Sequence, residues 1–129
     1  MENNVTTENI NYLRKFEELL INVKQDNVAV CLDLGHLLYG GLLEGNKNIF
    51  TELYNRKYLI SRIREIHLHD YNIEKDHLIV GEGLLSLDKV VKFLKENNVY
   101  CPIIIENSVL NIEKAIEQVN KIRESIKEN

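Results

Sequence analysis

Several residue types that mark particular protein classes are scarce in this chain of 129 residues. It has one proline, six glycines and no tryptophan, and no stretch reads as a low-complexity segment or a flexible linker. Its two cysteines, Cys31 and Cys101, lack the Cys-x-x-Cys spacing of zinc and redox motifs. Both fall in apolar runs, so we expect reduced, packed thiols. No apolar run approaches the ~18 residues of a membrane span.

Charge and composition narrow the class further. The formal net charge is −4 and the sequence pI is about 5.6, so a general basic surface for nucleic acid is not expected. With 44% hydrophobic and 28% charged residues, the chain is typical of a soluble globular protein, and its length fits a single domain over 1–129. The start, Met1-Glu2-Asn3-Asn4, lacks the features of a signal peptide, which predicts a cytoplasmic protein.

Short apolar runs alternate with segments of helical periodicity. Because such runs are typical of strands covered on both faces, the pattern predicts an α/β fold of parallel βα units in the order α-β-α-β-α-β-α. Glycines at 40–41, 45 and 81–83 indicate loops, the last of them a tight loop in the polar segment 70–85. The predicted elements are a helix over 8–24, a strand over 28–32, a helix over 47–60, a strand over 63–68, a helix from Ser86 to Asn97, a strand over 100–105 and a helix over 110–127.

Acids and imidazoles gather at the ends of these strands. Asp33, His67 and Glu106 each end one of the three predicted strands. His36 and the pair Asp76-His77 follow in the next segments. Because ligands of parallel βα folds bind at the carboxyl ends of the strands, we expect these groups to meet. Mixed carboxylate and imidazole ligands suit Zn²⁺, Mn²⁺, Co²⁺ or Fe²⁺.

Each of these residues also has a purely structural interpretation. Asp33 suits the cap of a following helix, His67 suits a core histidine, and Glu106 suits a partner for lysine. His69 alternates onto the side of His67, where it is expected to hydrogen-bond a ligand rather than bind the ion itself. Asp70 is expected either to support the site in the same way or to serve as a turn residue. The joint occurrence of such groups at three successive strand ends favours the metal site.

Four segments together resemble the xylose isomerase-like TIM-barrel superfamily, which includes sugar isomerases and epimerases and apurinic-site nucleases of the endonuclease IV type. The resemblance covers roughly 10–125 and corresponds to the sixth to eighth strands of the barrel. It implies a partial (β/α) TIM barrel with about three parallel strands and four helices. The segments are Cys31-Leu32-Asp33-Leu34-Gly35-His36, Glu65-Ile66-His67-Leu68-His69-Asp70, His77-Leu78-Ile79-Val80-Gly81-Glu82-Gly83 and Ile104-Ile105-Glu106.

The resemblance implies roles for individual residues. Asp33, His67 and Glu106 look like three of the four metal ligands of single-metal sugar epimerases, with Glu106 also an acid/base group. His36 looks like a catalytic neighbour that touches substrate or a second metal. Asp76 and His77 look like the pair that binds a further zinc in the nuclease branch, although that branch separates the two by one residue. The fourth metal-binding glutamate is expected to be absent, since no other glutamate ends a predicted strand.

Three functions are therefore open. The first is a divalent-metal-dependent isomerase or epimerase acting on a sugar or sugar phosphate. The second is a metal-dependent phosphodiesterase, of the endonuclease IV type or of the cobamide-remodelling type, with a small phosphate ester as its substrate. The third is a non-catalytic fragment or subunit. Because a full barrel has eight strands, we expect the chain to associate with itself or with a separately encoded N-terminal half.

Overall fold

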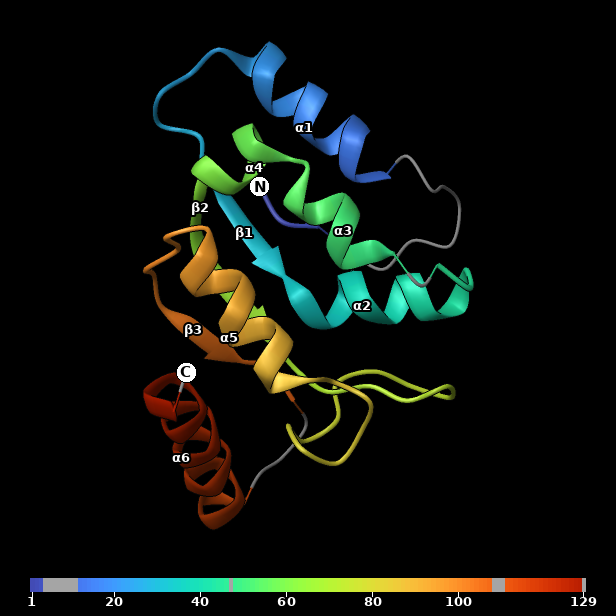
Figure 1. Cartoon of the computed structure of the whole chain (residues 1–129), viewed down its shortest axis with the longest axis vertical. Coiled ribbons are helices and arrows are strands. Elements are labelled where there is room, and N and C mark those ends of the chain that lie inside the picture. Colours follow the sequence, from blue (N-terminus) through green and yellow to red (C-terminus); the bar gives the residue numbers. More distant parts are fainter. Residues whose placement is uncertain (4–11, 47, 108–110, 129) are drawn as a thin grey trace.

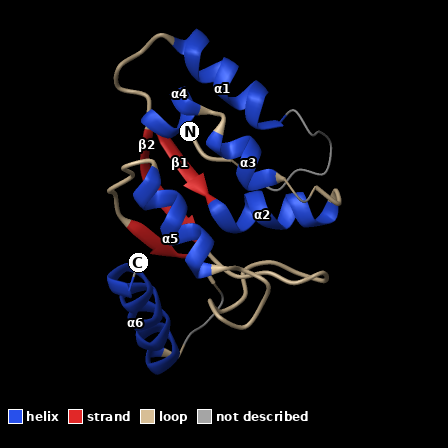
Figure 2. Ribbon diagram, in the orientation of Figure 1, coloured by secondary structure: helices blue, strands red, loops and turns tan. Residues whose placement is uncertain are grey.

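The computed structural model describes residues 1–3, 12–46, 48–107 and 111–128 (Figure 1). Helices and strands alternate along much of the chain, and coloured by type they form a small sheet with helices around it (Figure 2). The elements are α1 (Tyr12–Val23), β1 (Val30–Asp33), α2 (Leu34–Leu43), α3 (Ile49–Tyr54), α4 (Lys57–Ser61), β2 (Ile63–Leu68), α5 (Leu87–Glu96), β3 (Ile103–Ile105) and α6 (Ile112–Glu128).

The three strands form a parallel sheet in the order β1-β2-β3, which confirms the predicted α/β class. Asp33 lies opposite His67, and Leu68 lies opposite Ile105. The carboxyl ends of all three strands therefore reach the same edge of the sheet. This is the edge at which βα folds bind their ligands.

The two faces of the sheet have different surroundings. Leu32, Ile66 and Leu68 are fully buried and join the helices in the hydrophobic core. On the opposite face, Glu65 is partly exposed and Ile104 remains 42% exposed. Because successive side chains of a strand alternate between faces, Glu65 and His67 lie on this second face, on the side opposite Ile66 and Leu68.

The loop predicted at Gly40-Gly41 is wrong, because both glycines lie inside α2. This helix begins directly after β1, where Asp33 is its N-cap and accepts a hydrogen bond from the backbone N–H of His36 at 2.8 Å. The chain turns only at Gly45, whose φ of +69° suits glycine. Asp33 thus has the capping role that the sequence allowed as an alternative, and the helix that it caps includes both glycines.

The other boundaries shift less. The predicted helix over 47–60 is two helices, α3 and α4, since the chain breaks at Asn55-Arg56. The described residues therefore form six helices rather than four. The prediction for β2 is confirmed in full, whereas β3 is shorter than predicted. The predicted starts of the first and last helices, at 8–11 and 110, lie outside the described residues.

Residues 1–3 run alongside β1 and extend the sheet. The backbone N–H of Cys31 donates to Met1 O at 2.7 Å, and Glu2 forms a parallel bridge with Cys31. The Asn3 side chain exchanges two hydrogen bonds with the backbone of Asp33, at 2.8 and 2.7 Å. Residues 1–3 therefore cover part of the sheet edge at β1.

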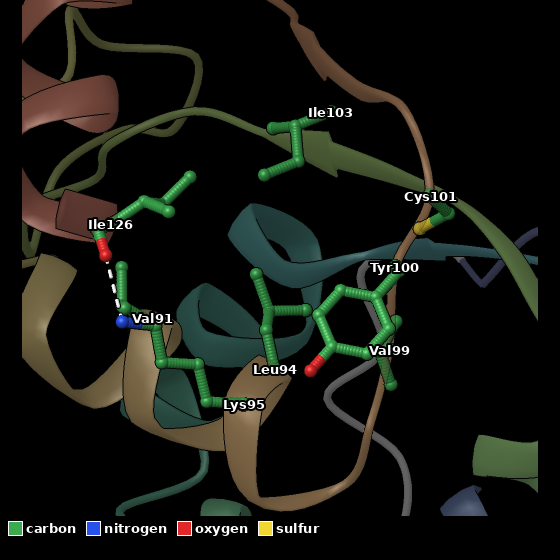
Figure 3. Close-up of a pocket in the computed structure, with 8 residues that line it drawn as sticks. All are labelled: Val91, Leu94, Lys95, Val99, Tyr100, Cys101, Ile103 and Ile126. Atoms are coloured by element: carbon green, nitrogen blue, oxygen red, sulfur yellow. Dashed lines mark hydrogen bonds between the residues drawn. The ribbon is translucent and has the colours of Figure 1, made fainter. Parts of the chain in front are cut away.

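An apolar pocket lies away from the polar strand ends, between α5, the segment that leads into β3 and the end of α6 (Figure 3). Lys95 Nζ closes one side by donating to Ile126 O at 2.7 Å. Its lining contains no acid or imidazole, and among the lining side chains only the sulfur of Cys101 could bind a metal. Its lining is Val91, Leu94, Lys95, Val99, Tyr100, Cys101, Ile103 and Ile126. Across the described residues, none of the helices has the length and apolar character needed to span a membrane.

Candidate metal centre

Four side chains meet at the carboxyl edge of the sheet. Asp33 is the last residue of β1, His67 is the second-to-last residue of β2, and Glu106 directly follows β3. Glu2 comes from the short segment beside β1. Each of the four offers one ligand atom, and these atoms all lie within 4.8 Å of one another. We call Glu2, Asp33, His67 and Glu106 the four-residue centre.

Glu2 is the residue that the sequence did not reveal. The expected absence of a fourth carboxylate is wrong, because pairing of residues 1–3 with β1 carries Glu2 to the site. A segment this short has no periodicity from which a strand can be predicted. The hydrogen bonds that place it come from the Asn3 side chain, and they exist only once β1 has formed.

The ring of His67 lies between carboxylates on both sides. Its Nδ1 is 3.0 Å from Glu2 Oε1 and 3.4 Å from Glu106 Oε1, and its Nε2 is 2.8 Å from Glu65 Oε1. Burial acts to lower the pKa of His67, but the hydrogen bond to Glu65 and the charges of Glu106 and Glu2 outweigh it, so this pKa is raised. A ring nitrogen beside two carboxylates is a ready position for a cation.

Asp33 is fully buried and only partly satisfied. Its Oδ1 accepts the capping hydrogen bond from His36, whereas its Oδ2 forms no hydrogen bond although His36 Nδ1 is 2.9 Å away. Burial acts to raise the pKa of Asp33, but the close contact with the His69 ring, the backbone hydrogen bond from His36 and the charges of both histidines outweigh it and lower this pKa. The carboxylate is therefore held ionised in the core, with one oxygen still available.

Unsatisfied atoms are concentrated here. Among the described residues, four buried side-chain nitrogen or oxygen atoms form no hydrogen bond: one is an oxygen of Asp33 and the other three are ring nitrogens of nearby histidines. The three ring nitrogens lie close to carboxylate oxygens, but the directions of their N–H bonds do not fit hydrogen bonds to those oxygens. Such a concentration of unpaired buried atoms indicates that the fold prepares these groups for a ligand. The atoms are Asp33 Oδ2, His36 Nδ1, His67 Nδ1 and His69 Nε2.

His69 lies behind Asp33 and is fully buried. Its Nε2 is 3.2 Å from Asp33 Oδ1, and its Nδ1 accepts a hydrogen bond from the backbone N–H of His77 at 3.0 Å. Burial acts to lower the pKa of His69, but the Asp33 carboxylate outweighs it and raises this pKa. The ring fits because residue 35 is glycine, where a Cβ would lie 2.3 Å from it. Both nitrogens face protein groups, so His69 is placed to hold Asp33.

A second cluster lies on the other side of Asp33. Ring nitrogens of His36, His69 and His77 lie within 4.8 Å of one another. Asp76 joins them, with its Oδ1 3.0 Å from His77 Nδ1 and its Oδ2 3.7 Å from His36 Nε2. The rings of His69 and His77 stack with centroids 4.1 Å apart. Because His69 is already engaged, His36, Asp76 and His77 are the members free to meet a ligand.

Asp70 organises the loop that brings Asp76 and His77 to this place. Its buried carboxylate accepts four backbone hydrogen bonds at 2.8–2.9 Å, from the N–H groups of residues 71, 81, 83 and 85. Gly83 permits this packing, since a Cβ there would lie 2.4 Å from Asp70 Oδ1. The glycines at 81–83 therefore donate their N–H groups to Asp70, in keeping with a tight loop.

Cys31 lies beside the four-residue centre but is a poor ligand. Glu2, Cys31 and His67 also offer atoms within 4.8 Å of one another. Burial raises the pKa of the Cys31 thiol to about 12, with further contributions from the charges of Glu2 and Glu65. In the metal-free chain the sulfur therefore keeps its proton at neutral pH, and a metal would have to displace that proton in order to bind it.

Comparisons with known proteins identify the family of this chain. The model of the family described as xylose isomerase-like TIM barrel matches residues 2–127. An uncharacterised protein of Methanocaldococcus jannaschii is 30% identical over 108 residues, covering 82% of this chain and 38% of that protein. A probable endonuclease 4 of Mycoplasmopsis synoviae is 31% identical over 100 residues, covering 70% of this chain and 36% of that protein.

A solved structure shares the fold. The D-psicose 3-epimerase of Clostridium cellulolyticum H10, in complex with D-tagatose, superposes with a TM-score of 0.69 at 14% identity. The match covers 98% of this chain and 48% of the epimerase, so the chain has the fold of part of a TIM barrel, as the sequence predicts. It spans less than two fifths of the length of the two relatives above. The chain belongs to the xylose isomerase-like TIM barrel family.

Proposed function

We propose that this chain carries the metal site of an isomerase or epimerase that acts on a sugar or sugar phosphate. The observation that supports this most is the four-residue centre, in which three carboxylates and an imidazole converge within 4.8 Å around ring and carboxylate atoms that lack hydrogen bonds. Membership of the xylose isomerase-like family and the fold shared with D-psicose 3-epimerase support the same reaction class.

The donor set fits a divalent ion. Glu2, Asp33 and Glu106 place three negative charges around one imidazole, and a cation would offset their mutual repulsion. Three oxygens and one nitrogen suit Zn²⁺, Mn²⁺ or Co²⁺. When bound, the ion would polarise carbonyl and hydroxyl oxygens of a sugar.

The residues of the four-residue centre have two proposed roles, as metal anchors and as acid/base groups. Asp33 is buried and His67 nearly so, which makes them fixed anchors, whereas the side chains of Glu2 and Glu106 remain 47% and 38% exposed. An exposed carboxylate at the site mouth can take a proton from a sugar carbon beside the carbonyl, and a second can return one. Glu2 and Glu106 are therefore the proposed pair of acid/base groups. His36, between Asp33 and Asp76, is placed to hydrogen-bond a sugar hydroxyl.

Metal binding by the chain itself is the first test. We expect one equivalent of Zn²⁺ or Mn²⁺ to bind in isothermal titration, and His67→Ala to abolish binding. Lys92→Ala, an exposed change on α5, is the matched control and should bind as the wild type does. Sugar turnover is then followed by chromatography of ketose mixtures. A wild-type chain that retains no divalent ion after dialysis would contradict the proposal.

A second candidate function has its own supporting observation. His36, Asp76 and His77 form a cluster that shares Asp33 with the four-residue centre, so two ions could bind side by side. Two adjacent ions suit metal-assisted hydrolysis of a phosphodiester. A second equivalent of Zn²⁺, lost in His77→Ala, together with hydrolysis of bis(p-nitrophenyl) phosphate would favour this function. One equivalent without hydrolysis favours the isomerase.

We also propose that the site works within a completed barrel. The sheet face that bears Glu65 and Ile104 is partly open, and no strand pairs with the outer edge of β3 in the part of the chain that the structure describes. Further strands, from a second copy or a separate N-terminal half, would cover both. Light scattering and metal analysis on one sample test this. A monomeric, metal-free and inert chain would instead favour the non-catalytic subunit.

A further inference from the structure

Glu65 contacts the four-residue centre through the ring of His67. This residue lies on β2 two positions before His67, so both side chains project from the same face of the sheet. Glu65 Oε1 lies 2.8 Å from His67 Nε2, and this is the aligned hydrogen bond of that ring. The ring nitrogen on the other side, Nδ1, is buried and forms none.

This hydrogen bond fixes which nitrogen of His67 carries the proton. An ionised carboxylate can only accept, so the proton of the neutral ring belongs on Nε2, facing Glu65. The lone pair of Nδ1 then lies on the side of the ring that has Glu2 Oε1 and Glu106 Oε1 near it, at 3.0 and 3.4 Å from the nitrogen. A lone pair beside two carboxylates is repelled by them unless a cation lies between the groups. The ring is therefore prepared for an ion on its Nδ1 side.

Glu65 is itself held in place by β1. Cys31 and Glu65 are partners in the parallel register, and the Cys31 thiol donates to Glu65 Oε1 with a sulfur–oxygen distance of 3.7 Å. The same carboxylate oxygen thus receives the thiol of one strand and the imidazole of the next. Because it is bound in this way on the far side of the ring, Glu65 is not placed to be a ligand.

We propose that Glu65 is a positioning residue that sets the tautomer and orientation of His67 and so raises the metal affinity of the four-residue centre. The arrangement is a carboxylate that holds a histidine, which in turn binds the ion. The inference rests on the proposed metal site and adds to it a residue that does not touch the ion. It also explains why an acidic residue, Glu65, lies within β2 two positions before His67.

Two measurements test this role, and the first needs no metal. Nitrogen-15 NMR of the metal-free chain, at a pH that leaves His67 neutral, reports which ring nitrogen is protonated. We expect the Nε2–H form in the wild type, a mixture of both forms in Glu65→Ala, and the Nε2–H form again in Glu65→Gln, whose amide oxygen can still accept. The signal is assigned by its absence in His67→Gln. An Nδ1–H ring in the wild type would overturn the proposal.

The second measurement is Zn²⁺ affinity by competition with a chelator. Glu65→Ala should bind about tenfold to a hundredfold more weakly than the wild type, as is typical when the carboxylate behind a metal-bound histidine is lost. Glu65→Gln should recover part of that loss. Glu117→Gln removes the same charge from an exposed position on α6 and should leave the affinity unchanged.

The outcomes separate the two proposals. If the wild type binds Zn²⁺ and Glu65→Ala binds it equally well while keeping its circular dichroism spectrum, the role of Glu65 is refuted and the metal site stands. If the wild type binds no divalent ion, both fail together. If Glu65→Ala does not fold, Glu65→Gln decides: binding weaker than that of the wild type, with the Nε2–H ring retained, supports the proposal, and wild-type affinity with an Nδ1–H ring refutes it.

Discussion

Two buried aspartates at neighbouring strand ends have opposite surroundings. Asp33 and Asp70 are both fully buried. Each oxygen of Asp70 accepts two backbone hydrogen bonds, whereas Asp33 has one such bond on Oδ1 and none on Oδ2. A buried charge that the backbone fully satisfies serves the fold. A buried charge left partly unsatisfied among other acids and imidazoles is poised for a cation, and this difference separates structural from functional groups here.

The largest effect should follow from Asp70→Ala. It leaves four backbone N–H groups of a packed loop without their acceptor, and each unsatisfied buried donor costs on the order of 1–3 kcal/mol before water enters. We expect the free energy of unfolding to fall by about 4 kcal/mol or more, measured by urea denaturation. Asp26→Ala, at an exposed position, should change it by less than about 0.5 kcal/mol. A small loss in Asp70→Ala would remove the contrast between the two aspartates.

Asp33→Asn should act on binding rather than on folding. The amide keeps an oxygen for the cap of α2 but removes the charge that faces the centre. We expect metal affinity to fall at least about a hundredfold, or about 2.7 kcal/mol, with a smaller loss of unfolding free energy in the metal-free chain than Asp70→Ala causes. Titration calorimetry and urea denaturation on the same variant measure both. If stability falls as much as it does in Asp70→Ala, Asp33 is a structural residue as well.

Gly35→Ala tests how tightly His69 is held against Asp33. The new methyl group would lie 2.3 Å from the His69 ring, so the ring must shift, and overpacking of this kind costs about 1–3 kcal/mol. Gly41→Ala is the control in the same helix, because its methyl group would meet Ile49 at a tight but adjustable 3.2 Å. We expect Gly35→Ala alone to weaken both stability and Zn²⁺ affinity. Equal effects of the two substitutions would show that the His69 contact is unimportant.

Much of the fold could be predicted because its signals are local. The apolar run of β2 and the capping by Ser86 depend on neighbouring residues, and the structure has both where they were expected. Gly40-Gly41 misled because a strong cap at Asp33 and burial of Gly41 outweigh the weak helix preference of glycine. Local propensity fails where tertiary contacts decide.

Some residues of the candidate site could likewise be predicted from the sequence, and others could not. Asp33, His67 and Glu106 lie at or directly after the carboxyl ends of the three strands, so their convergence could be expected from parallel pairing alone. Glu2 could not, since its place depends on side-chain hydrogen bonds from Asn3 to a strand 30 positions away. The sequence also left the role of Asp70 open, because the backbone N–H groups that satisfy its carboxylate leave no trace in the sequence.

The smallest expected effect is the pH dependence of the metal-free chain, which again contrasts acid with imidazole. The pKa of His67 and of His69 is raised above 6.5 in the folded chain, so their stabilising contribution is complete below pH 6.5 and is lost as the pH rises through the raised values. The pKa of Asp33 is lowered below 3.8, so its contribution is present above that pH and is lost only in stronger acid.

Without metal, stability should therefore decline modestly from about pH 6 to 8, and less so in His67→Gln. With saturating Zn²⁺ the trend should reverse, because the ion binds only the neutral ring. Urea denaturation with and without the ion measures this, and a metal-free chain that gains stability over the same range would contradict the assigned imidazole–carboxylate contacts.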